Sequence, residues 1–132
     1  MRRKGVLAAA VILAALTAAV LIARGKMPYQ DLKASEVVSA AVRLSPPDET
    51  VPIADPEELV ALLKKVVIYR EDNSYTEYSG QAVTFTLTMA DWSQEEITAY
   101  SPFLIVNGTG YRAKYEPCEQ LNRYANQLRN AG

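Results

Sequence analysis

An unbroken run of 19 uncharged residues, Gly5–Ala23, is the feature that most constrains this chain of 132 residues. The run holds four Leu, two Ile, three Val and eight Ala, with one Gly and one Thr. As a helix rising about 1.5 Å per residue it would extend roughly 28 Å, close to the ~30 Å hydrocarbon core of a bilayer. A helix that is apolar on every side needs a large protein around it in water, and this chain supplies none. The run therefore predicts a membrane segment.

This segment fits two fates. Arg2, Arg3 and Lys4 form the basic start of a secretory signal peptide, and small residues would allow cleavage after Ala19 or after Gly25. The apolar run is longer than is usual in signal peptides and basic residues follow it directly, which favours an uncleaved anchor. No cysteine lies near its end, so lipidation of a cysteine at a new N-terminus is excluded. More basic residues precede the run than follow it, so we expect a cytoplasmic N-terminus.

Charge divides the chain at the same place. Residues 1–26 hold five basic side chains and no acid, a formal charge of +5. The whole chain has 14 basic and 15 acidic side chains, so residues 27–132 keep nine basic and all 15 acidic ones, a charge of −6. We expect a single-pass membrane protein with this acidic part outside, or the same part secreted after cleavage. A domain of this charge without a basic stripe would be repelled by phosphates, so no nucleic-acid partner is expected.

The division defines three parts. Residues 1–26 are a signal-anchor or transmembrane segment, residues 27–34 are a tether, and residues 35–132 are a single extracytoplasmic α+β domain. Alternating apolar residues or turn signals predict strands at 36–44, 50–53, 81–90, 95–100, 103–106 and 111–115. Asn107-Gly108 accepts positive φ and predicts the turn of a hairpin. The segment Val66–Arg70 fits either the last turn of a helix or a strand.

Two helices are predicted in the domain. Asp55-Pro56-Glu57-Glu58 places a capping carboxylate, a first-turn proline and two acids at a helix start, and leucines follow at helical spacing. Pro117 opens the second helix, at 118–130, which has one apolar face. The order of segments is thus β-β-α-β-β-β-β-α, in which the short second strand is optional. We expect a two-layer α+β fold with about four antiparallel strands and two helices on one face.

The composition excludes several kinds of catalytic site. The chain has no histidine, which excludes a Ser-His-Asp triad, a Cys-His pair and histidine metal ligands. A single cysteine, Cys118, excludes an internal disulfide, a Cys₄ zinc site and a CxxC pair. Its spacing places Cys118 on the apolar face of the second helix, where it fits a buried inert residue; an intermolecular disulfide or a redox thiol is the alternative. No catalytic residue, cofactor or metal is therefore assigned.

Three groups of acids have an ordinary interpretation beside a functional one. The acids at 55–58 would suit calcium, but helix capping accounts for them. Those at 71–77 flank a polar loop that lacks the spacing of a calcium loop. Glu95 and Glu96 are neighbours on a strand, so they point to opposite faces and make a poor acid/base pair. Asn107-Gly108-Thr109 matches a glycosylation acceptor, although a hairpin turn needs the same Asn-Gly.

Aromatic residues supply the candidate binding surface. The chain has eight tyrosines, and several are predicted near loops or strand edges. Tyrosine and tryptophan are enriched where proteins contact partners, and tyrosine is also common at the rim of a small core. The residues assigned to a partner-binding surface are Tyr69, Tyr75, Tyr78 and Trp92.

Five segments carry a resemblance that covers most of residues 30–130. They are Val37-Val38-Ser39-Ala40, Asp55-Pro56-Glu57-Glu58-Leu59, the Tyr75–Gly80 loop, Val83–Met89 and Gly110-Tyr111-Arg112-Ala113-Lys114-Tyr115. In these segments the chain resembles small uncharacterised membrane-anchored or lipoprotein-like exported proteins of Firmicutes bacteria. The resemblance implies an exported α+β domain at a bacterial cell envelope and transfers no catalytic residue. Many such proteins carry a lipidated cysteine after the signal, which this chain lacks.

Three functions from different classes remain. The first is a non-enzymatic, membrane-tethered extracytoplasmic domain that is held by residues 5–23 and binds a protein or peptide partner at the cell envelope. The second is an exported sensor domain that binds a small ligand or an ion at loop 71–77 and the nearby tyrosines. The third is a hydrolase that uses carboxylates alone, which needs two acids converging in a cleft about 5–10 Å apart.

Overall fold

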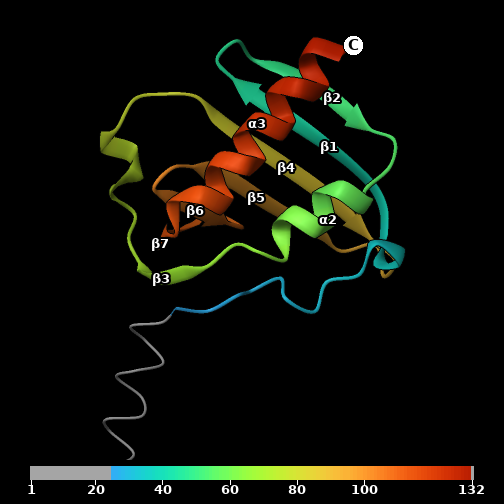
Figure 1. Cartoon of the computed structure of the whole chain (residues 1–132), viewed down its shortest axis with the longest axis horizontal. Coiled ribbons are helices and arrows are strands. Elements are labelled where there is room, and N and C mark those ends of the chain that lie inside the picture. The colour runs from blue at the N-terminus through green and yellow to red at the C-terminus, as the bar shows by residue number, and fades with distance from the viewer. Residues whose placement is uncertain (1–24, 132) are drawn as a thin grey trace, which may run out of the picture.

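A computed structural model describes residues 25–131, in which one antiparallel sheet packs against two α-helices (Figure 1). The predicted membrane segment, 5–23, lies outside the described residues. Within them, neither helix combines the length and the apolar character that a membrane crossing requires. The elements, with η for a 3₁₀ helix, are η1 (Ala34–Glu36), β1 (Val37–Ser45), β2 (Glu49–Ile53), α2 (Glu57–Leu63), β3 (Ile68–Glu71), η2 (Ser74–Glu77), β4 (Ala82–Met89), β5 (Gln94–Tyr100), β6 (Phe103–Val106), β7 (Thr109–Ala113) and α3 (Tyr115–Ala131).

The sheet has seven strands in the order β2-β1-β4-β5-β6-β7-β3, and every neighbouring pair is antiparallel. The α+β class is confirmed, but the prediction of about four strands is wrong. β3, at one edge, has three exposed residues among its four, so it lacks the alternation that identifies a half-buried strand. β2 forms the other edge, where its Pro52 is tolerated.

The predicted hairpin between β6 and β7 is confirmed. Asn107 and Gly108 form its two-residue turn with positive φ of 49° and 89°, which Asn and Gly adopt at low cost. The Asn107 side chain also serves the sheet, because its Oδ1 accepts a hydrogen bond from the backbone N–H of Glu96 at 2.8 Å. The Asn107 side chain therefore has a structural role, because it bonds to the backbone of β5.

The hydrophobic core lies between one face of the sheet and the two helices, which both cover that face (Figure 1). Phe85 on β4 is fully buried and stacks on Tyr124 of α3, with ring centroids 6.2 Å apart. Leu63 of α2 and Leu121 of α3 are likewise fully buried. α2 begins at Glu57 with Pro56 at its N-cap, one residue later than the predicted cap at Asp55, and Asp55 Oδ1 accepts the backbone N–H of Glu57 at 3.0 Å.

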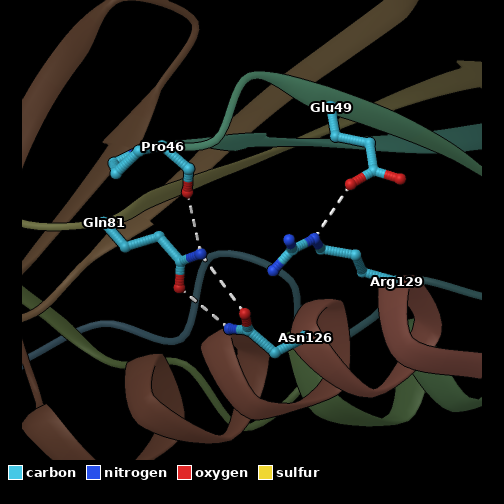
Figure 2. Close-up of polar contacts among 5 residues, drawn as sticks. All are labelled: Pro46, Glu49, Gln81, Asn126 and Arg129. Atoms are coloured by element: carbon cyan, nitrogen blue, oxygen red, sulfur yellow. Dashed lines mark hydrogen bonds and ion pairs between the residues drawn. The ribbon is translucent and has the colours of Figure 1, made fainter.

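A side-chain network attaches α3 to the turn between β1 and β2 (Figure 2). Gln81 Nε2 donates to the Pro46 carbonyl at 3.0 Å and to Asn126 Oδ1 at 3.2 Å. Gln81 Oε1 accepts from Asn126 Nδ2 at 2.9 Å. Nearby, Arg129 Nε donates to Glu49 Oε2 at 2.9 Å. These directional bonds hold the C-terminal half of α3, whereas the buried residues of the helix lie at 117–125, in its first two thirds.

Replacing Gln81 with leucine should lower the free energy of unfolding by about 1–3 kcal/mol, because the Pro46 carbonyl loses its donor and the Asn126 side chain keeps only its bonds to Asn122. Urea denaturation followed by circular dichroism measures this loss. Gln127→Leu is the matched control, since Gln127 lies exposed on α3, and it should change stability by less than about 0.5 kcal/mol. Equal losses in the two variants would contradict a stabilising role for the network.

Candidate functional site

The face of the sheet opposite the helices is polar and partly open. Alternation brings the threonines of β4 and β5 to this face, where Thr84 and Thr98 share a hydrogen bond of 2.8 Å between their hydroxyls. Glu96 and Tyr100 of β5 lie on the same face, because their neighbours Ile97 and Ala99 are buried in the core. This face is thus built of side chains that can bind by hydrogen bonds and by aromatic contact.

The connection from β3 to β4 crosses this face above β6 and β7. Its start is held by three hydrogen bonds to β7: the Asp72 N–H donates to the Gly110 carbonyl at 2.8 Å, the Gly110 N–H donates to Asn73 Oδ1 at 2.7 Å, and Arg112 Nε donates to Asp72 Oδ2 at 2.8 Å. Gly110 is needed for the approach, since a Cβ there would lie 2.6 Å from the Asp72 carbonyl oxygen and 2.7 Å from the Tyr75 ring.

Phe103 is the platform on which this connection rests. It is fully buried although it points away from the helices, because other side chains cover its ring. The ring of Tyr75 meets it edge-on at 6.3 Å between centroids, and the ring of Tyr78 lies tilted at 5.3 Å. The Arg112 guanidinium stands 4.5 Å from the ring centroid, within the range of a cation–π contact. These four residues form a second, smaller cluster on the open face.

Hydrogen bonds favour the ionised form of Asp72. Bonds from Ser74 and from Arg112 hold the pKa of the Asp72 carboxyl well below its ordinary value, since they favour the ionised form. The pKa of Arg112 is raised, first by Asp72 and then by Tyr78. Asp72 therefore stays ionised at neutral pH, and its two oxygens are occupied within the domain by Ser74 and Arg112.

The depressed pKa of Asp72 predicts a pH dependence. An ionised Asp72 favours the folded state, so its contribution is complete above its unfolded pKa, about 3.9, and is lost as pH falls through the lower folded pKa. The melting temperature of Asp72→Asn should lie below that of the wild type at pH 6, and the gap should shrink steadily below pH 4. A gap of the same size at pH 6 and pH 2.5 would show that Asp72 does not act through its charge.

A hollow of about 510 Å³ opens between this connection and the sheet. Thr98 of β5 and Ile105 of β6, which are paired in the sheet, form part of its floor. The tyrosines Tyr75, Tyr78 and Tyr100 form part of its wall. Glu96 is the one acidic or basic residue among those that line it. The lining residues are Ser45, Tyr75, Tyr78, Ser79, Gly80, Ala82, Glu96, Thr98, Tyr100, Ile105 and Gly108.

The structure brings together two of the four aromatic residues assigned from the sequence. Tyr75 and Tyr78 both contact Phe103 and both line the hollow. Tyr69 lies on β3 and is 40% exposed, while Trp92 projects from the turn between β4 and β5 and is 75% exposed. Neither Tyr69 nor Trp92 lines the hollow.

Sequence reasoning did not assign Tyr100 to the site. Its signal is the alternation of β5, which puts Tyr100 on the face opposite Ile97 and Ala99. The Cβ position of Gly80 lies 3.5 Å from the Tyr100 ring, so the end of the connection passes directly over this tyrosine. Reading β5 for its polar face as well as its apolar face would have identified Tyr100.

Other candidate residues take structural positions. Cys118 is fully buried in α3, and burial, followed by the charge of Glu119, raises the pKa of its thiol to about 12. Glu95 accepts a hydrogen bond from the Tyr29 hydroxyl at 3.2 Å, whereas Glu96 lies across the strand at the hollow. Among residues 25–131, no three Cys, Asp or Glu side chains gather as a metal site would require.

Comparison with known proteins adds no relative. No family model matches the chain, and neither a curated protein nor a solved structure shows significant similarity to it. The function is therefore argued from the site and its residues, since a fold alone does not determine an activity.

Proposed function

We propose that this protein is a non-enzymatic, membrane-tethered extracytoplasmic domain that binds a protein or peptide partner at the cell envelope. Residues 5–23 hold the chain in the membrane, and the open face of the sheet is the binding surface. The observation that carries the proposal is the hollow walled by Tyr75, Tyr78 and Tyr100 on the one sheet face that α2 and α3 leave uncovered.

The residue types of the hollow suit a side chain of a partner. Tyrosines offer large rigid contact area and a hydroxyl at little cost in conformational entropy, and they are frequent in the centres of interfaces. Threonine and serine hydroxyls around them supply hydrogen bonds to a peptide backbone. Glu96 gives the hollow a negative charge, so a basic or neutral side chain is favoured and an acidic one is repelled.

Light-induced cross-linking in living cells tests the proposal on the full chain. A photoreactive phenylalanine analogue in place of Tyr78, which is 52% exposed at the hollow, should give a discrete cross-linked product with an envelope protein. The matched control replaces Tyr115, which is 59% exposed at the start of α3, away from the hollow. Tyr100→Ala should remove the product formed at 78. Identical products from both positions, or none at 78, would refute the partner site.

The volume of the hollow also favours a second candidate, a sensor domain for a small ligand. A volume of about 510 Å³ lies within the range of small-molecule sites, about 300–1,000 Å³. Since Glu96 is the charged group there, an amine is the ligand class that fits. A thermal-shift series with arginine, lysine and choline should raise the melting temperature with concentration, and Glu96→Gln should abolish the shift. No shift with any amine would remove this candidate.

A further inference from the structure

The chain is fastened to the domain immediately after the predicted membrane segment. The Lys26 N–H donates to the Ile68 carbonyl at 2.7 Å, and the Ile68 N–H donates to the Lys26 carbonyl at 2.8 Å, which adds a bridge to the outer edge of β3. Gly25 lies so close that a Cβ would stand 2.6 Å from Val67 and 2.9 Å from the Tyr69 ring. Figure 1 shows this segment passing directly beside β3.

This junction fixes which part of the domain meets the bilayer. The uncharged run ends at Ala23, and an extended chain advances at most about 3.6 Å per residue. Gly25 therefore lies within about 7 Å of the end of the membrane segment. Because Gly25 packs on Val67 and Tyr69, β3 must stand at the level of the lipid headgroups. This step rests on the proposed anchoring of residues 5–23.

The arginines and the lysines of the domain differ in whether they form ion pairs. Among the described residues, every arginine has a carboxylate within 4.0 Å, whereas no lysine does. Four of these five lysines surround the junction: Lys26 pairs with β3, Lys64 and Lys65 lie in the chain that leads into it, and the Lys114 N–H donates to the Val67 carbonyl at 2.9 Å. All four are exposed.

Two acids lie close to this cluster along the chain. Glu116 is held by Arg123 at 2.6 Å, and Glu71 is the one acid on β3. Two exposed tyrosines, Tyr69 and Tyr115, flank the lysines along the chain, and amphipathic aromatic rings are enriched at the membrane interface. Lysines and tyrosines at headgroup level are the combination that binds a surface of anionic lipid.

We propose that this end of the domain is a lipid-binding seat, made of Lys26, Lys64, Lys65, Tyr69 and Lys114, which docks on the headgroups of anionic phospholipids. β3 is a terminal strand of the sheet, so a domain seated on it stands on the edge of its sheet. The open face with the hollow then faces sideways along the membrane, where an envelope partner reaches it. The seat would thus fix the orientation of the domain relative to the membrane.

Paramagnetic broadening in nanodiscs tests the seat with the full chain. The nanodiscs carry headgroup-spin-labelled lipid in phosphatidylcholine, either alone or with about one third phosphatidylglycerol. In the anionic nanodiscs, the amide signals of β3 and Lys114 should broaden much more than those of β2, the opposite edge of the sheet. Without anionic lipid the contrast should weaken.

Charge-matched variants make the test specific. The ratio of membrane-seated to free domain is read from the broadening of β3 relative to β2. Lys64→Gln/Lys65→Gln/Lys114→Gln should lower this ratio by about fivefold for each lysine removed. Arg43→Gln/Arg123→Gln/Arg129→Gln removes the same formal charge from arginines that are already paired, and should leave the ratio unchanged. Equal loss in both variants, or the same contrast between β3 and β2 with and without anionic lipid, would overturn the seat alone. If β3 were broadened no more than β2 in either nanodisc, the position assigned to the junction would be overturned as well. Loss of the wild-type chain from the nanodiscs would overturn the anchor and the seat together.

Discussion

Replacing Phe103 with alanine should lower the free energy of unfolding by about 3–5 kcal/mol, the range for truncating a buried phenylalanine. Phe103 is fully buried, and its ring supports Tyr75, Tyr78 and Arg112 at once. Truncation removes the contacts of all three and opens a cavity beneath them. Urea denaturation measures the loss of stability, with Val38→Ala as the control, because Val38 is 54% exposed on β1.

The same variant should act on the site before the domain unfolds. Without the Phe103 ring, Tyr75 and Tyr78 lose an aromatic contact that holds residues 74–80 on the sheet, so the backbone amides of these residues should exchange with solvent faster while those of β4 stay protected. Hydrogen exchange at neutral pH separates the two regions. A loss below about 1 kcal/mol, or uniform exchange across the domain, would contradict the role of Phe103 as platform.

Two arginines in the apolar run should abolish membrane anchoring. Ala14 and Ala15 lie at the centre of Gly5–Ala23, where each arginine disfavours insertion by about 2.5–3.5 kcal/mol, or about 5–7 kcal/mol for Ala14→Arg/Ala15→Arg. The nine Leu, Ile and Val residues of the run favour insertion by only about 3–5 kcal/mol. Extraction of membranes at alkaline pH should leave the wild type in the pellet and release any variant that accumulates.

The control adds the same charges elsewhere. Gln127→Arg/Asn130→Arg places two arginines on exposed positions of α3 and should leave the protein in the membrane fraction. If the central pair also stayed embedded, residues 5–23 would not be what holds the protein.

Local patterns predicted the parts of the fold that depend on local physics. Alternation located β1, β4 and β5, the Asp55 carboxylate marked the start of α2, and Asn107-Gly108 marked the last hairpin. The sequence does not distinguish β3 from a helix end, because a β-branched run beside a helix has no period of its own. β3 is held at the edge of the sheet by backbone hydrogen bonds to β7, and such bonds do not depend on the identity of the side chains.

The candidate site was less accessible from the sequence, because its contacts span long separations. Tyrosine content near a polar loop was enough to assign Tyr75 and Tyr78. Nothing local indicates that Asp72 meets Arg112, 40 residues away, or that both tyrosines rest on Phe103. Only the order of the strands, which places β7 beside β3 and β6, brings these residues together.

The N-terminal mass of the protein isolated from cells tests most directly whether this is a tethered domain. Anchoring predicts that the protein is recovered from the membrane fraction with residues 5–23 intact. A mature chain that starts at Val20 or at Lys26 in a soluble fraction would contradict it, because the domain would then be released and neither the tether nor the lipid-binding seat would hold it at the membrane.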